Sequence, residues 1–310
     1  MLETSPPLSP LQRYISLSTR LFQIRKIIDY RRRAVFVLRS LGNHGVMKEL
    51  NDFVEQDTVW REVVAHHPWL YEQITRQLFY RGSTIHERRV LIMDHCRIFG
   101  TYFSDETLRK IYIKEGLQLW SGEFQNSQVS LQLGFHPRNQ KEGLASIGLK
   151  SGDRNLYQII FWVAQDPAGI RSLWIGTLQG SSGKMQTYRD LTKHCYGYRP
   201  KNLVLFALRK IAHQIGAEQI YAISNYGHYA NNHLRIDRKL QGSMNEFWQE
   251  TGGQISSDPR FFMLPVVEPR KTIEQTKPHK HTLYRKRFAM LDEIDQVITA
   301  VLKANLKTKD

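Results

Sequence analysis

The turn after the apolar segment Ala217–Ser224 carries side chains that can transfer protons. Asn225 and Tyr226 follow this segment directly, at the kind of strand end where open α/β sheets place ligand-binding groups. A positioned tyrosine hydroxyl can protonate a leaving thiolate, and His228 and His233 can act as bases near neutral pH. The alternative interpretation is a polar loop that closes a strand.

Glu142 is a third candidate for acid or base chemistry. It stands at the start of Gly143–Leu149, where apolar and polar residues alternate as in a half-buried strand. The alternative is a charge at the end of a strand ladder. The predicted catalytic residues are therefore Asn225, Tyr226 and Glu142.

A second candidate site lies between the segment Trp174–Gly180 and a helix that begins near Lys201. A helix start presents unpaired N–H groups and the positive end of the helix dipole, so it favours phosphate. Arg199 and Lys201 add positive charge there, and Pro200 suits a first helical turn. An alternative is a helix cap packed by a proline and an arginine. The residues predicted to bind a phosphorylated cofactor are Leu178, Gln179, Gly180, Gly197, Arg199, Lys201 and Asn202.

The order strand, glycine-bearing loop, helix and strand resembles the cofactor core of the GNAT acyltransferases. That resemblance implies acyl-CoA as the cofactor, held at the helix start, and direct acyl transfer without a covalent enzyme intermediate. The usual Gln/Arg-x-x-Gly-x-Gly/Ala loop of those enzymes does not occur in this sequence.

Histidine and cysteine are poorly placed for metal or thiol chemistry. Pairs such as His66-His67 and His194-Cys195 do not supply three or four ligands at zinc-site spacing. Cys96 and Cys195 lie far apart without a CxxC motif, which argues against a disulfide scaffold. The sequence therefore predicts no metal and no thiol nucleophile.

The net charge of +15 is concentrated in two segments of the 310-residue chain. Gln12–Arg39 contains eight basic residues against Asp29 alone, and Arg270–Ala289 contains seven against Glu274. Together they leave a charge of only +2 for all the other residues. This pattern predicts an anionic partner at defined places rather than a uniformly basic surface.

Aromatic side chains stand among these basic residues, for example Tyr14 and Tyr30 near the N-terminus and Tyr284 near the C-terminus. Such a combination can stack on nucleic acid or insert into an anionic lipid surface. No recognisable nucleic-acid-binding motif is present. The competing hypothesis is thus a non-enzymatic basic protein that docks on nucleic acid or on an anionic membrane; a scaffold with a vestigial cofactor pocket is a third.

Helical periodicity dominates the first 120 residues, where Asp57 and Ser104 are expected to cap helices. The predicted helices are Leu11–Leu41, Val46–Val54, Trp60–Ala65, Leu70–Phe79, Thr84–Phe99 and Glu106–Leu117. An antiparallel meander is then expected from Gln128–Phe135, Gly143–Leu149, Leu156–Ala164 and Ser172–Leu178.

After these strands we expect a loop over Gln179–Tyr198 and a helix to Gln214, which crosses over to a parallel strand at Ala217–Ser224. The remaining predicted elements are a helix tail at Asn245–Thr251, a strand at Phe261–Val267 and a C-terminal helix at Leu283–Leu306.

The predicted fold is α+β, with a helical region at residues 1–120 that includes a basic first helix. A mixed, largely antiparallel GNAT-like core with flanking helices and a basic C-terminal helix follows at residues 121–310. Apolar runs such as Ile159–Ala164 are far shorter than the roughly 20 residues that span a bilayer. Met1–Pro10 lacks the pattern of a secretory signal. The sequence therefore predicts a soluble cytoplasmic protein, with peripheral contact to the inner membrane as an open possibility.

Several local motifs together resemble the bacterial VirK/YbjX family over most of the chain. They are His95, Lys141-Glu142-Gly143, Leu178-Gln179-Gly180, Gly197-x-Arg199-Pro200-Lys201, Phe247-Trp248 before Gly252-Gly253, and Arg285-Lys286-Arg287. One departure is Ser243-Met244-Asn245, which stands in place of an Asp-Tyr-Asp-like segment. The resemblance implies a bacterial cytoplasmic protein linked to virulence, stress, envelope remodelling and resistance to cationic antimicrobial peptides.

Overall fold

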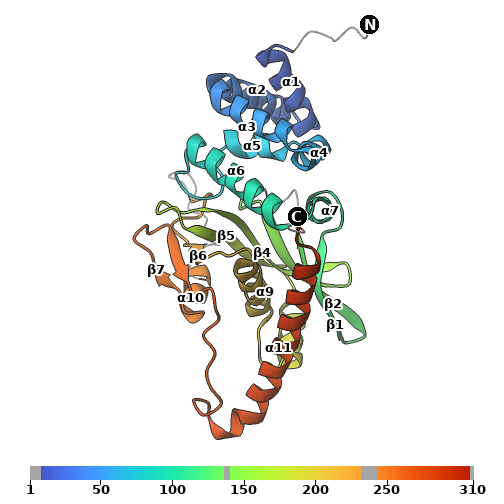
Figure 1. Ribbon diagram of the computed structural model, residues 1–310, viewed down its shortest axis with the longest axis vertical. Coiled ribbons are helices and arrows are strands. Elements are labelled where there is room, and N and C mark those ends of the chain that lie inside the picture. Colours follow the sequence, from blue (N-terminus) through green and yellow to red (C-terminus); the bar gives the residue numbers. More distant parts are fainter. Residues whose placement is uncertain (1–7, 136–139, 232–242, 308–310) are drawn as a thin grey trace.

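The computed structural model describes residues 8–135, 140–231 and 243–307, with a stack of helices at one end of a mixed sheet (Figure 1). These helices are α1 (Pro10–Leu21), α2 (Ile27–Gly42), α3 (His44–Gln56), α4 (Thr58–His66), α5 (Trp69–Thr75), α6 (Ile85–Tyr102) and α7 (Asp105–Tyr112). The two predicted caps are confirmed. The Asp57 carboxylate accepts the first free N–H groups of α4, and the Ser104 hydroxyl accepts one from α7.

The basic segment Leu11–Leu41 was predicted as one helix, and this was wrong. It forms α1 and α2, which fold back on each other as a unit that we call the α1–α2 hairpin. At the reversal, the Asp29 carboxylate accepts the backbone N–H groups of Arg25 and Lys26 at 3.1 and 3.0 Å. Helical spacing of apolar residues continues through this break, so periodicity alone did not reveal it.

Within the described residues one sheet of eight strands follows, in the order β1-β2-β3-β4-β5-β6-β8-β7. The strands are β1 (Leu117–Phe124), β2 (Ser127–Gly134), β3 (Ala145–Ser151), β4 (Arg154–Gln165), β5 (Arg171–Gly180), β6 (Gln219–Ile223), β7 (Gln254–Ile255) and β8 (Phe261–Leu264). The antiparallel meander and the parallel pairing of β5 with β6 are confirmed. Two strands were not predicted, because β1 contains a register shift and β7 has only two residues.

The predicted loop Gln179–Tyr198 was also wrong, because it contains the helix α8 (Met185–His194). α8 is mostly polar, and Leu191 is its single buried residue, so the composition of this segment favoured a loop. The remaining helices are α9 (Pro200–Gln214), α10 (Ser243–Glu250) and α11 (His281–Ala304).

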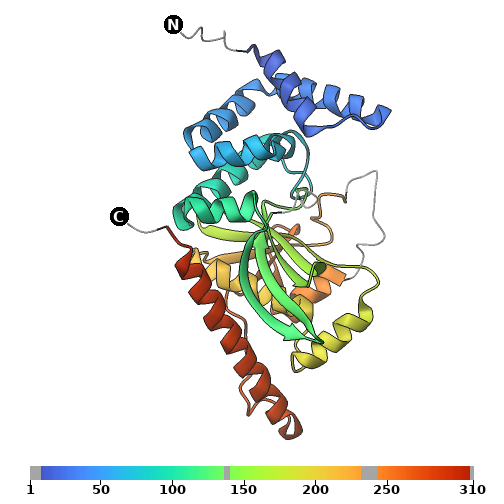
Figure 2. The same ribbon diagram turned by 90° about the vertical axis from the view of Figure 1, so that its right-hand side faces the viewer.

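Helices flank the sheet as predicted, and the fold is α+β. α9 packs against β3, β4 and β5, while α11 packs against α9 and β1 (Figures 1 and 2). α11 begins at the end of the molecule opposite the α1–α2 hairpin and finishes beside α6 and α7 (Figure 1). In the part of the chain that the structure describes, no helix is both long and apolar enough to cross a membrane.

The edge of β4 joins the helical part to the sheet. β3 pairs with β4 only as far as Phe161, so the next residues of β4 need another partner on that side. α6 supplies it: the Val163 N–H donates to Nδ1 of His95 at 3.1 Å, and the Gln165 N–H donates to the Asp94 carboxylate at 3.2 Å. The Nε2 atom of His95 lies 2.6 Å from the Tyr112 hydroxyl.

His95 is therefore a neutral, structural histidine. Its Nδ1 atom accepts a hydrogen bond, so the ring hydrogen belongs on Nε2, where it reaches Tyr112. Complete burial of the ring lowers the pKa of His95 from 6.5 to about 3.

We predict that His95 makes the fold sensitive to acid. Below pH 6.5 the unfolded chain takes up a proton that the folded ring excludes, so the free energy of unfolding falls as the pH falls. This contribution amounts to about 2 kcal/mol between pH 7 and pH 5. His95→Gln should lose it and should also be less stable at pH 7, as measured by urea unfolding at both pH values. The exposed histidine on the same helix provides the control: His86→Gln should behave like the unmodified protein. Equal acid sensitivity in His95→Gln would contradict the assignment.

Candidate functional site

Glu142 lies on the sheet at a point where only glycine allows the chain to approach so closely. A Cβ atom at residue 176 of β5 would overlap the Glu142 carbonyl oxygen, and one at residue 143 would lie 2.7 Å from the Phe161 carbonyl oxygen. The Leu144 N–H donates to that same oxygen at 2.9 Å, next to a register shift between β4 and β5. Two glycines and a local irregularity of the sheet therefore fix the position of Glu142.

The Glu142 side chain is buried, with 7% of the residue exposed, and the Tyr229 hydroxyl is close enough to act on its carboxyl. Burial raises the pKa of Glu142 from 4.5 to about 7, against the smaller opposing effects of Lys141 and of the Tyr229 hydroxyl. Burial and the nearby carboxylate raise the pKa of Tyr229, so this phenol stays protonated and is able to donate to Glu142. Glu142 can thus release and take up a proton near neutral pH.

The segment between α5 and α6 links Glu142 to the turn after β6. The Phe79 N–H donates to the Lys141 carbonyl at 2.9 Å, and the Arg81 N–H donates to the Gly227 carbonyl at 2.7 Å. Nη1 of Arg260 donates in turn to the Arg81 carbonyl at 3.1 Å. Phe79 is fully buried with a φ of 71°, an unusual conformation for a bulky residue that the surrounding contacts must maintain.

The two predicted catalytic residues of this turn, Asn225 and Tyr226, lie in different surroundings. The Asn225 N–H donates to Oδ1 of Asn245 at 2.8 Å, and its own Oδ1 atom is buried without a partner among the described residues. Tyr226 is 50% exposed and lies under the Arg81 guanidinium, 4.4 Å from the ring centroid. The hydroxyl that contacts Glu142 comes from Tyr229, three positions further on.

The two histidines of the same turn have separate outcomes. His228 is buried, and its Nδ1 atom accepts the Ala230 N–H at 3.3 Å. His233 lies outside the described residues.

A second set of polar contacts, which sequence reasoning missed, lies at the end of α5 near Tyr229. The Glu72 carboxylate accepts hydrogen bonds from Arg76 and from Nε2 of Gln140, the latter at 2.8 Å. The positive charge of Arg76 also acts on the Tyr229 hydroxyl. The four-residue spacing of Glu72 and Arg76 is the sequence signal that could have predicted their ion pair, since residues four apart share a helix face.

The predicted cation site at the start of α9 is present but is already paired with an acid. Nη2 of Arg199 donates to the Glu250 carboxylate of α10 at 2.6 Å, and Nζ of Lys201 lies 3.8 Å from the same oxygen. Nε of Arg199 donates to the Asn202 side chain at 3.1 Å. The hydrogen bond from Arg199 lowers the pKa of Glu250, while burial lowers the pKa of Lys201.

α8 separates the end of β5 from the start of α9, so Leu178–Gly180 lead into α8 and not into α9 as expected. Tyr157 of β4 nevertheless brings the two segments close. A Cβ atom at Gly180 would lie 2.8 Å from the Tyr157 ring, and the charge of Arg199 acts on the Tyr157 hydroxyl. Gln179, exposed at the end of β5, accepts a hydrogen bond from Gln158 at 3.4 Å.

Gly197 belongs to the turn that ends α8. Its φ of 79° favours glycine, and its N–H donates to the Thr192 carbonyl at 2.7 Å. The Arg287 side chain of α11 fills the space beside it and donates two hydrogen bonds to the Tyr196 carbonyl, at 2.9 and 2.7 Å. In this structure Gly197 therefore allows α11 to dock.

Other reactive side chains do not assemble into a site. Among residues 8–135, 140–231 and 243–307, no group of three or more His, Cys, Asp or Glu residues could hold a metal ion. Cys195 is buried, and burial raises the pKa of its thiol to about 11, so the thiol stays protonated at neutral pH. His194 packs against Phe124 with ring centroids 5.3 Å apart.

The fold and this site define an α+β protein with a helical cap and a buried carboxyl, that of Glu142, against its sheet. The chain belongs to the family described as "Protein of unknown function (DUF535)", whose sequence profile matches residues 25–300. It is 29% identical to the "Uncharacterized protein YbjX" of Escherichia coli (strain K12), over 96% of this chain and 92% of that protein. It is also 28% identical to an "Uncharacterized protein" of Haemophilus influenzae, over 84% and 86% of the two chains. The resemblance to the VirK/YbjX family is thereby confirmed.

We predict that Glu142 opposes folding at alkaline pH. Between pH 4.5 and about 7 the folded protein retains a proton that the unfolded chain has lost, so the free energy of unfolding falls as the pH rises through this range. The loss due to Glu142 alone between pH 5 and pH 8 should be about 2 kcal/mol. His95 contributes a change of opposite sign over part of this range, so the readout is the difference from the unmodified protein. In urea unfolding, the free energy of Glu142→Gln should rise by about 2 kcal/mol more than that of the unmodified protein between these pH values, whereas the exposed-residue control Glu123→Gln should match the unmodified protein. The same pH dependence in Glu142→Gln and the unmodified protein would refute a raised Glu142 pKa.

Proposed function

We propose that this protein is an acyltransferase in which Glu142 is the general base. The observation that carries the proposal is the buried Glu142 carboxyl, whose pKa of about 7 suits proton transfer under physiological conditions. The acceptor amine or hydroxyl would attack the thioester carbonyl of the donor, form the new acyl bond and give its proton to Glu142. The carbon–sulfur bond would break, and the thiolate would take a proton, for which Tyr226 stays the candidate donor. Tyr229 would position Glu142 by donating a hydrogen bond to its carboxylate.

The geometry of β5 supports an extended donor such as acyl-CoA. β5 pairs with β6 only as far as Ile175 and Ala222, so Gly176–Gly180 have no partner strand on that edge within the described residues. An extended chain with amide groups, such as the pantetheine arm of CoA, can hydrogen-bond to such an open edge. Glu142 lies against Gly176, the first residue of the open stretch. The order of β5, a helix pair (α8 and α9) and the parallel strand β6 resembles the core of GNAT acyltransferases, with α8 as an additional helix.

The phosphates of the donor would bind the cations next to this edge. Arg199 and Lys201 lie at the start of α9, and Lys184 precedes α8. Glu250 now neutralises part of the charge at α9, so a phosphate would have to compete with it. An acceptor from the bacterial envelope, met at the cytoplasmic face of the inner membrane, fits what the family resemblance implies.

Removal of Glu250 should strengthen binding of the donor, because the competing carboxylate is lost. In isothermal titration with CoA, acetyl-CoA and a long-chain acyl-CoA, we expect Glu250→Gln to bind several-fold more tightly and Arg199→Gln several-fold more weakly. Glu218→Gln changes an exposed acid before β6 and should have no effect. Absence of heat with all three ligands, for every variant, would refute the acyl-CoA site.

The catalytic role of Glu142 has a separate readout. CoA release from acyl-CoA, followed with a thiol reagent and a mixture of amine and hydroxyl acceptors, should increase with pH through about 7 as Glu142 loses its proton. Glu142→Gln should lower kcat by 100-fold or more, on the order of a lost general base, and should abolish this pH dependence. A variant with unchanged kcat would exclude Glu142 as the base.

A further inference from the structure

The α1–α2 hairpin carries large apolar side chains that face solvent next to its arginines. Ile27 is 89% exposed and Leu38 is 69% exposed. Ile27, Arg31 and Leu38 share one face of α2, because residues four and seven apart lie above one another. Ile28, at the next position, is also exposed. Burial of such side chains in water-free surroundings is favourable, so this face is suited to a partner that is both apolar and anionic.

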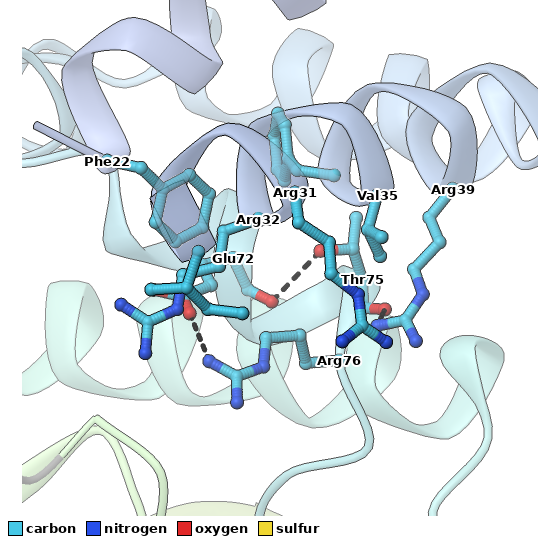
Figure 3. Close-up of a pocket in the computed structure, with 10 residues that line it drawn as sticks. Phe22, Arg31, Arg32, Val35, Arg39, Glu72, Thr75 and Arg76 are labelled. Carbon is cyan, nitrogen blue, oxygen red and sulfur yellow. Dashed lines mark hydrogen bonds and ion pairs between the residues drawn. The ribbon is translucent and has the colours of Figure 1, made fainter. Parts of the chain in front are cut away.

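A pocket of about 290 Å³ opens beside this face, between α2 and α5 (Figure 3). Phe22 and Phe36 form part of its apolar wall, with ring centroids 6.2 Å apart. Its cationic lining consists of Arg31, Arg32, Arg39 and Arg76. An apolar wall with several guanidinium groups matches a phosphate attached to a hydrocarbon chain.

Two of these four arginines, Arg31 and Arg39, have guanidinium N–H groups that a ligand could use. Arg32 is paired with Asp29 at 2.9 Å, and Arg76 is paired with Glu72. Arg31 and Arg39 make no ion pair within the described residues, and Arg39 has only a 3.5 Å hydrogen bond to the Thr75 carbonyl. Figure 3 shows both side chains directed from α2 toward Thr75 and Arg76 of α5.

We propose that the α1–α2 hairpin docks on an anionic phospholipid membrane, with a lipid phosphate in this pocket between Arg31 and Arg39. Ile27, Ile28 and Leu38 would enter the interfacial layer, while the neighbouring arginines contact lipid phosphates. Exposed aliphatic side chains favour lipid over nucleic acid, since they neither stack on bases nor form hydrogen bonds.

The second basic segment does not belong to this surface. The start of α11, which carries Arg285–Arg287, lies at the opposite end of the long axis of the molecule (Figure 1). Arg287 is moreover engaged with the Tyr196 carbonyl. A membrane that contacts the hairpin would therefore leave the start of α11 facing away from it. The docking proposal does not depend on acyl transfer, although the charge of Arg76, which lines the pocket, also acts on Tyr229.

Vesicle co-sedimentation of the full chain tests this proposal without any acyl donor, so its outcome is independent of the CoA titrations. We expect binding to vesicles of phosphatidylcholine mixed with phosphatidylglycerol, little binding to phosphatidylcholine alone, and a steep loss of binding with salt. Ile27→Glu should weaken binding about tenfold or more, and Arg31→Gln and Arg39→Gln about fivefold each. The matched controls Met185→Glu, on exposed α8, and Lys286→Gln, at the far end, should bind like the unmodified protein.

Three results would overturn the proposal. One is no preference for anionic vesicles while thermal unfolding shows the unmodified protein to be folded. Another is the absence of vesicle binding together with tight binding of an RNA or DNA oligonucleotide. If Arg31→Gln weakened that binding and Ile27→Glu did not, the hairpin would be a nucleic-acid surface. The third is binding of soluble glycerophosphate as tight as that of vesicles, which would make the pocket a site for a free phosphate. Ile27 and Arg31 are exposed, so their substitution should leave thermal unfolding unchanged.

Discussion

The hydrogen bond between the Val163 N–H and Nδ1 of His95 satisfies a backbone group of β4 that β3 no longer reaches. An unpaired N–H in this buried place would be costly, so α6 must lie along the strand. With α6 in place, the segment before it runs between Lys141 and Gly227 and fixes both sides of the candidate site. The same helix stack supports α5, which forms one wall of the basic pocket. The two candidate sites therefore depend on how one strand edge is completed.

Two buried ionisable groups in this structure respond to burial in opposite ways. The neutral imidazole of His95 is part of the framework, and burial keeps it uncharged down to acidic pH. Burial also disfavours the charged form of Glu142. For a carboxyl this raises the pKa, here to about 7, so that Glu142 titrates near neutral pH. One physical effect thus keeps the histidine neutral down to acidic pH and raises the pKa of the glutamate toward neutrality.

The basic side chains of the two candidate sites differ in how far neighbouring acids pair with them. At the start of α9, Glu250 reduces the field of Arg199 and Lys201, so the predicted phosphate site exists as a paired set of side chains. Around the α1–α2 hairpin, Asp29 and Glu72 occupy Arg32 and Arg76 and leave Arg31 and Arg39 without ion pairs among the described residues. Two arginines without an ion pair among the described residues thus lie at the hairpin pocket, while the sheet carries the buried carboxyl of Glu142.

The sequence by itself determined the α+β class, the meander, the parallel crossover and the two basic segments, because periodicity, turn residues and charge are local properties. It also pointed to Glu142, which precedes a recognisable strand. It could not determine that Tyr229 rather than Tyr226 contacts Glu142, or that Glu250 pairs with Arg199, because these partners are 87 and 51 positions apart. Only the tertiary structure decided that the two basic segments lie at opposite ends, and that a strand edge capped by His95 holds the site together. Burial and long-range hydrogen bonding set both outcomes, and neither is written in the spacing of residues along the chain.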